Sequence, residues 1–170
     1  MLNIPEYKEY GGETKIALMD NSSLAFMHEL SQKSYPSDGI LSVYDLILIP
    51  KWVMEEIEDS TYRSTYVEQL QAQGYPIRWI DETKYGTFVN DEDVNLYYIV
   101  EAAVSRVSEL MRFLRRKVKT EDLIDLPSAE EWMNRLYDEW PIHGRTLSTG
   151  RALKKNAGEI SLTILAEIFA

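Results

Sequence analysis

The stretch LILIPKWVMEEIE, residues 46–58, indicates how this chain folds. Its first part, Leu46–Ile49, is a short continuous apolar run, which is typical of a strand buried on both faces. Pro50 follows at the first turn of a predicted helix, where its missing N–H would have had no partner. A buried strand that passes directly into a helix predicts a β–α unit of an α/β protein.

Two further runs with strand character lie on either side of this unit, at Lys15–Met19 and Pro76–Ile80. Helical spacing of apolar residues is found at Leu24–Leu30 and, after the helix that Pro50 opens, at Tyr62–Gln73. Strands that alternate with helices favour a mainly parallel sheet. The sequence therefore predicts an α/β fold over its first half.

The second half of the chain is expected to be largely helical. Apolar residues at steps of three or four predict one long helix over residues 94–118. Ser128 and Glu131 have the spacing of a capping box before another helix. We interpret residues 91–140 as a helical insert in a single domain that spans residues 1–170.

Composition narrows the chemistry that this chain can perform. It has 170 residues, no cysteine, two histidines and a formal net charge of −10. Thiolate metal sites, a cysteine nucleophile and a three-histidine site are therefore excluded, and the acidic balance argues against a simple cationic nucleic-acid binder. No apolar run approaches the roughly 20 residues of a membrane span, and no secretory segment is recognisable. We expect a cytoplasmic protein without a membrane segment, whose chemistry depends on carboxylates.

Two acids follow the first two predicted strands. Asp20 ends the first strand, and in open α/β sheets ligands bind just beyond the carboxyl ends of strands. The ordinary alternative is that Asp20 caps the next helix. Glu56 lies on the apolar side of its helix, where a carboxylate is costly unless a cation meets it. The alternative for Glu56 is a residue at the edge of the buried face.

A third acid, Glu159, follows Gly158 at the start of a predicted helix over Ala157–Phe169. This helix is apolar on nearly every side, which predicts that it is buried. A first-turn acid is favoured by the helix dipole without any function. Because few positions of the helix can face solvent, we expect the Glu159 carboxylate to point into a polar pocket.

Three segments together resemble the PIN-domain family of metal-dependent ribonucleases, which includes the toxins of many toxin–antitoxin pairs. They are ALMDNSSLAFM at 17–27, LILIPKWVMEEIE at 46–58 and NAGEISLTILA at 156–166. The resemblance implies a PIN-like three-layer α/β/α sandwich with a central, mainly parallel sheet. The family has a further acidic strand after the last helix. The sequence ends at Ala170 before such a strand, so the expectation is either a fragment or an incomplete site.

The resemblance implies that Asp20, Glu56 and Glu159 are catalytic metal ligands. Mg²⁺ or Mn²⁺ suits such an all-oxygen site, because it relieves the repulsion between carboxylates. The implied reaction is hydrolysis of RNA phosphodiesters that leaves a 5′-phosphate and a 3′-hydroxyl. Substrate contacts are expected from Ser22 and from four basic residues, where a solvated basic face is an equally good interpretation: Arg145, Arg151, Lys154 and Lys155.

Two other functions stay open. The chain could be a degenerate PIN-like binding module without nuclease activity, in which the helix at 94–118 presents a face to an antitoxin protein or to a second copy. It could also be a DNA nuclease, a class that generally carries more acids at its site. Further acids are available, which we interpret as solvated loop charge or helix caps: Asp81, Glu82, Asp91, Glu92 and Asp93.

Overall fold

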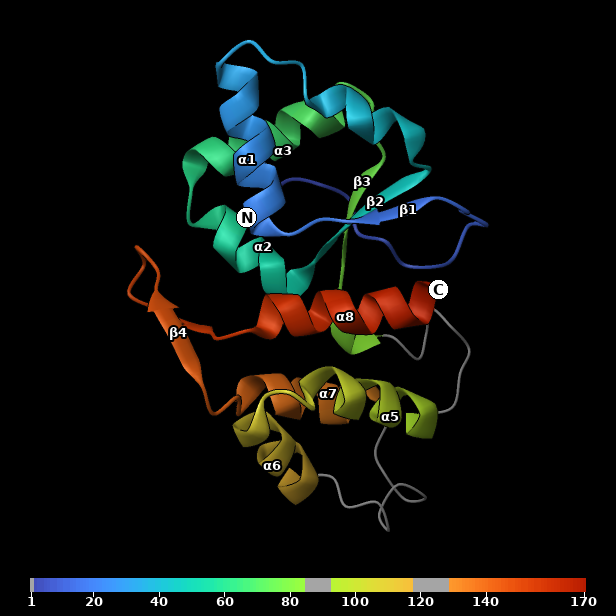
Figure 1. Cartoon of the computed structure of the whole chain (residues 1–170), viewed down its shortest axis with the longest axis vertical. Helices are drawn as coiled ribbons and strands as arrows, with labels where there is room; N and C mark the ends of the chain where they lie inside the picture. Colours follow the sequence, from blue (N-terminus) through green and yellow to red (C-terminus); the bar gives the residue numbers. More distant parts are fainter. Residues whose placement is uncertain (1, 85–92, 118–128) are drawn as a thin grey trace.

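Three short parallel strands form the centre of the computed structural model, which describes residues 2–84, 93–117 and 129–170 (Figure 1). The strands are β1 (Ile16–Leu18), β2 (Leu46–Pro50) and β3 (Ile77–Ile80), in the order β1-β2-β3. All three lie within segments predicted as strands, and the mixed α/β class with a parallel sheet is confirmed.

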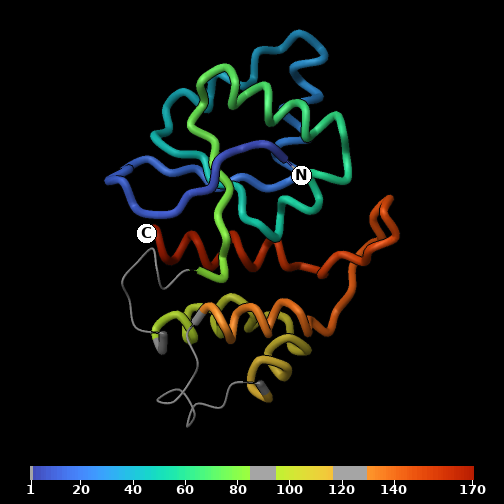
Figure 2. Tube along the Cα trace, turned by 180° about the vertical axis from the view of Figure 1, so that it is seen from behind, coloured from blue at the N-terminus to red at the C-terminus, as the bar shows by residue number. Residues whose placement is uncertain are grey.

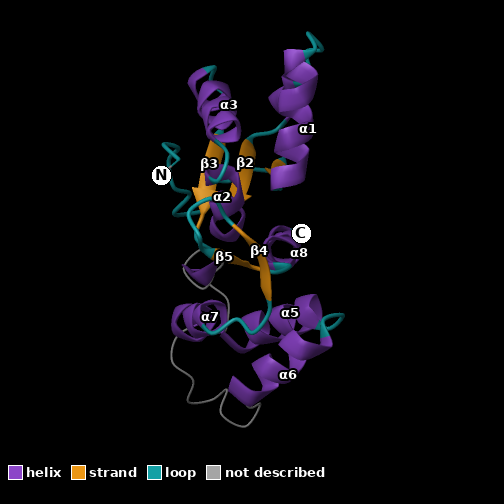
Figure 3. Cartoon of the chain, turned by 90° about the vertical axis from the view of Figure 1, so that its left-hand side faces the viewer, coloured by secondary structure: helices purple, strands orange, loops and turns teal. Residues whose placement is uncertain are grey.

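Helices pack on both faces of this sheet because neighbouring strand residues point to opposite sides. Ile47 and Ile49 of β2 belong to one core with residues of α1 (Asn21–Gln32) and α3 (Thr61–Ala72). Leu46 and Leu48 belong to a second core with α8 (Ala157–Phe169) and the helices beyond it. The short helix α2 (Lys51–Glu58) contributes to both cores, and Figure 3 shows it at the end of the strands. Two short 3-10 helices complete this half: η1 (Asp38–Val43) and η2 (Glu82–Lys84).

The helices of the second half pack beneath α8 (Figure 2). They are α5 (Asp93–Val104), α6 (Ser108–Lys117) and α7 (Ala129–Asp138). The prediction of one helix over 94–118 is therefore wrong. Twenty-five helical residues would extend over about 38 Å, whereas the break after Val104 folds α6 back so that both helices reach the same core. Val118 and the capping-box residue Ser128 lie outside the described residues.

A small antiparallel hairpin connects α7 to α8. Its strands are β4 (His143–Thr146) and β5 (Ala152–Lys154), and Gly150 at the turn has φ +85°. Local sequence did not predict these strands, because most of their residues are polar and only Leu153 is buried. The hairpin extends away from the three-stranded sheet, alongside the end of α2 (Figures 1 and 3).

No helix within the described ranges is both long enough and apolar enough to span a membrane.

Candidate functional site

Asp20 follows β1 and caps α1. Its Oδ1 accepts a hydrogen bond of 2.7 Å from the backbone N–H of Ser23. The alternative interpretation of Asp20 as a helix cap is therefore confirmed. This role uses one carboxylate oxygen, and Asp20 also lines a small hollow at the carboxyl end of the sheet.

All three acids of the predicted site border this hollow, which we call the acid hollow. Glu56 comes from the last turns of α2, and Glu159 comes from the first turn of α8. The hollow has a volume of about 30 Å³, which is room for one water molecule or one ion. Ser22, the predicted substrate contact on α1, also lines it. The full lining is Asp20, Asn21, Ser22, Val53, Glu56, Gly158, Glu159 and Leu162.

Helices α2 and α8 approach each other closely beside these acids. A Cβ atom on Gly158 would lie 3.2 Å from Val53 Cγ2 and 3.8 Å from Glu56 Oε1. Gly158 therefore lets the start of α8 approach the helix that carries Glu56. Asn156 precedes α8 in the left-handed conformation, with φ +63°, which asparagine adopts more readily than most residues.

The acid hollow disfavours negative charge as it stands. Burial, and then the nearby negative charge of Glu159, raise the pKa of Glu56, although Arg145 and Arg63 act in the opposite direction. Glu56 also accepts a 3.2 Å hydrogen bond from Asn21 Nδ2. The other amide atom of Asn21, Oδ1, is buried and has no hydrogen-bond partner within the described residues. A cation in the hollow would offset the repulsion and give Asn21 Oδ1 a partner.

The donor chemistry fits Mg²⁺ or Mn²⁺, since every polar group at the acid hollow that could bind a metal does so through oxygen. In the described ranges, however, no three His, Asp or Glu side chains are close enough together to hold a metal ion. Two of the three carboxylates already accept a hydrogen bond, Asp20 through Oδ1 and Glu56 through Oε2. The structure thus brings the three acids to one hollow without assembling them into a ligand set.

A wider groove of about 490 Å³ adjoins the acid hollow, and we call it the basic groove. Glu56 and Glu159 form one side of it, and the β4–β5 hairpin supplies the rest. Three of the predicted substrate-binding residues, Arg145, Lys154 and Lys155, line this groove. Lys154 also donates a hydrogen bond to the backbone carbonyl of Asp138.

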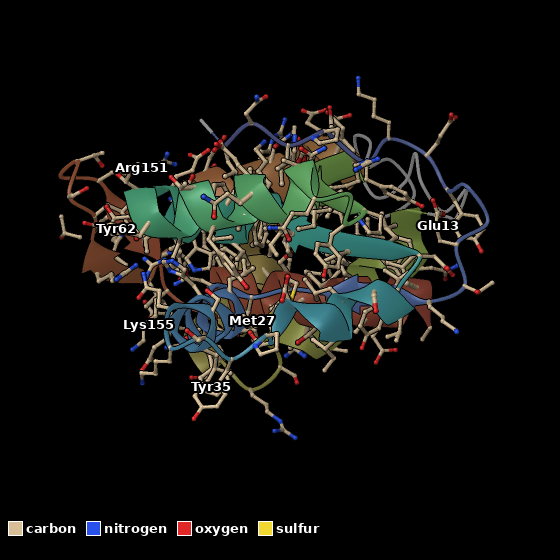
Figure 4. All side chains as sticks on the ribbon, turned by 90° about the horizontal axis from the view of Figure 1, so that it is seen from above. Glu13, Met27, Tyr35, Tyr62, Arg151 and Lys155 are labelled. Carbon is tan, nitrogen blue, oxygen red and sulfur yellow. The ribbon has the colours of Figure 1, made fainter. Side chains whose placement is uncertain are left out.

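Arg151, the fourth basic residue of the prediction, does not line either cavity. It forms an ion pair of 2.9 Å with Glu55, which also accepts a hydrogen bond from Tyr137. Figure 4 shows Arg151 and Lys155 at the same end of the molecule, together with the exposed ring of Tyr62. Arg151 therefore fastens the hairpin to α2 and lies apart from the acid hollow.

A second attachment of the hairpin was missed from the sequence. Asp59 lies at the end of α2, and its Oδ1 accepts two hydrogen bonds from Ser148. One comes from the backbone N–H of Ser148, at 2.8 Å, and the other from its Oγ, at 2.6 Å. These bonds hold the pKa of Asp59 below its usual value. The residues are far apart in sequence, and no local pattern connects them.

Two of the acids that we interpreted as solvated loop charge or helix caps are buried, so they are not solvated charge. Asp81 follows β3, and its carboxylate meets Lys51 Nζ and the backbone N–H and Oγ1 of Thr83. Glu82 is completely inaccessible to solvent. That part of our interpretation is wrong for Asp81 and Glu82, because both fold under α2. Asp91 and Glu92 lie outside the described residues, as does the side chain of Asp93.

Comparison of the chain with protein-family models, with curated proteins and with solved structures finds no match.

Proposed function

We propose that this chain is a PIN-like ribonuclease that uses Mg²⁺ or Mn²⁺ to hydrolyse RNA phosphodiesters. The observation that carries the proposal is that Asp20, at the cap of α1, Glu56 of α2 and Glu159 of α8 border one hollow. The sheet flanked by two helical layers also agrees with the PIN-like α/β/α sandwich. Asn21 Oδ1, buried without a partner in the described residues, adds a further oxygen at the same place.

The division of labour follows from the two cavities. Asp20, Glu56 and Glu159 would hold the cation. Asp20 would bind it through Oδ2, because its Oδ1 accepts the capping hydrogen bond from Ser23. The bound cation supplies Lewis acidity and an activated water at neutral pH. Arg145 and Lys155 in the basic groove would bind the phosphates of the strand, because cationic side chains provide most of the affinity for a nucleic-acid backbone.

The test is cleavage of an end-labelled single-stranded RNA in Mn²⁺, with EDTA as the reference. Asp20→Asn and Glu159→Gln are each expected to abolish cleavage and to leave the far-ultraviolet circular dichroism spectrum unchanged. Glu167→Gln is a matched control, since it removes an exposed acid of the same helix α8 that does not line the acid hollow. Full activity in both site variants would contradict the proposal. Cleavage of a DNA strand of the same sequence, measured in parallel, distinguishes a ribonuclease from a DNA nuclease.

A binding module without nuclease activity is the second candidate, and a specific observation favours it. Large apolar side chains are exposed on α1 and around η1: Phe26, Tyr35, Ile40 and Val43. This surface replaces the face of the 94–118 helix as the place for an antitoxin protein or a second copy. A binding module predicts no thermal stabilisation by millimolar Mn²⁺, whereas the ribonuclease predicts that the melting temperature rises.

A further inference from the structure

Glu82 joins the two helices that carry Glu56 and Glu159. Its carboxylate is completely buried, and its Oε1 accepts two hydrogen bonds at once. One comes from the backbone N–H of Trp52, at 2.9 Å, and the other from Ser161 Oγ, at 2.7 Å. Trp52 lies on α2, one helical turn before Glu56. Ser161 lies on α8, two residues after Glu159. A single oxygen atom therefore connects both helices.

A helix cap alone does not account for this arrangement. The residue before α2 is Pro50, which has no side-chain cap, so the N–H of Trp52 does need an acceptor. A short hydroxyl or carboxyl residue near the helix start usually supplies one. Glu82 instead reaches in from the end of β3, and its Oε2 is left buried without a partner in the described residues. Such burial is costly, so an explanation must include the second bond, to α8.

Two contacts set the separation of α2 from α8. At the acid hollow, the missing side chain of Gly158 lets Val53 and Glu56 come close. On the other side of the same pair, Glu82 bonds to both helices. The first contact sets how near the helices can come, and the second keeps them from moving apart.

We propose that Glu82 is a positioning residue, which fixes the distance between Glu56 and Glu159 by holding α2 and α8 through one carboxyl oxygen. The consequence for metal binding rests on the ribonuclease function proposed above. The consequence for the helix separation does not.

The experiment compares Glu82→Gln with Glu82→Met. The two replacements are close in size and shape, but only glutamine keeps an acceptor at the Oε1 position. We expect Glu82→Gln to bind Mn²⁺ like the wild type. Glu82→Met is expected to lose about 10-fold or more in Mn²⁺ affinity and in kcat, with little change in KM for RNA, because the basic groove is untouched. Asp81→Asn is the matched control, since Asp81 is also buried but bonds to Lys51 and Thr83 and not to α8.

A metal-free measurement keeps this proposal separate from the function. The nuclear Overhauser effect between the Val53 methyl groups and the Gly158 Hα protons reports the separation of α2 and α8. It should weaken in Glu82→Met and stay strong in Glu82→Gln. If Glu82→Met does not fold, Ser161→Ala removes the bond to α8 alone and should weaken the same signal.

An unchanged Val53–Gly158 signal in the acceptor-free variants overturns the positioning role, whatever the metal does. Equal Mn²⁺ affinity in the glutamine and methionine variants overturns its effect on the acids. If the wild type neither binds Mn²⁺ nor cleaves RNA, the ribonuclease proposal fails, and the nuclear Overhauser comparison still decides whether Glu82 sets the helix separation.

Discussion

Acids follow two of the three strands, yet the two places differ in almost every physical respect. Asp20, after β1, borders the acid hollow together with Glu56 and Glu159. Asp81 and Glu82, after β3, are buried beneath α2 and form hydrogen bonds with groups of the protein itself. A position at the carboxyl end of a strand therefore does not distinguish an acid that can bind a ligand from one that holds the fold. Accessibility and bonding partners make that distinction.

The largest expected effect on stability comes from deleting the buried acid. Glu82→Ala leaves the Trp52 N–H and Ser161 Oγ without their acceptor and opens a cavity, so the free energy of unfolding should fall by about 3–4 kcal/mol. Glu159→Gln at the acid hollow should change it by no more than about 0.5 kcal/mol. Urea unfolding of both variants at pH 7 measures the two changes in the free energy of unfolding. Equal losses would contradict the distinction between the buried acids after β3 and the acids of the acid hollow.

The pH dependence of stability should show the next effect. Burial raises the pKa of Glu82 from 4.5 to about 7. The folded state therefore holds a proton that the unfolded state has released, and the free energy of unfolding falls as pH rises from about 4.5 to about 7. Glu82→Gln should remove this contribution to the slope. The measurement is urea unfolding of wild type and Glu82→Gln at pH 5 and pH 7.5; parallel changes in both would contradict it.

Replacing an acid at the acid hollow should raise the free energy of unfolding, whereas deleting Glu82 should lower it. The gain in stability is accompanied by a loss of activity. Burial and the charge of Glu159 raise the pKa of Glu56, so its ionised form is disfavoured in the folded protein at neutral pH. Glu56→Gln should stabilise the metal-free protein by a small amount, roughly 0.5 kcal/mol, and abolish RNA cleavage. The gain should vanish at a pH low enough to protonate Glu56. Thermal melts with EDTA at neutral and acidic pH test this, and a loss of stability at pH 7 would count against the repulsion.

The smallest effect is expected at the hairpin. Ser148→Ala removes the hydrogen bond from Ser148 Oγ to Asp59, which is one of the two bonds that attach the hairpin to that residue. The unfolding free energy should not change measurably, while KM for RNA rises about twofold through a looser basic groove. Thr149→Ala, at the same exposed turn, is the control. An unchanged KM would mean that the basic groove does not depend on this attachment.

Local sequence predicted what local interactions decide. The strands could be located because Leu46–Ile49 is apolar without interruption and its two counterparts, Lys15–Met19 and Pro76–Ile80, are mostly apolar. The acids at 20, 56 and 159 were found through their places at the ends of helices and strands together with the three segments that resemble the PIN-domain family. The break after Val104 could not be found, because a stripe of apolar residues has the same spacing whether a helix continues or folds back. The buried bond of Glu82 could not be found either, because its partner Ser161 follows 79 residues later in the sequence, after the helices of the second half.

The three carboxylates of the acid hollow are far apart in sequence, at positions 20, 56 and 159, and this separation has a kinetic consequence. Loop closure over long sequence separations costs entropy before any contact compensates for it, so structures with such contacts form slowly. The β1–β2 and β2–β3 pairings require much shorter closures than the docking of α8. A growing polypeptide would thus acquire its sheet before its acid hollow, and the site would exist only after α8 has packed against α2.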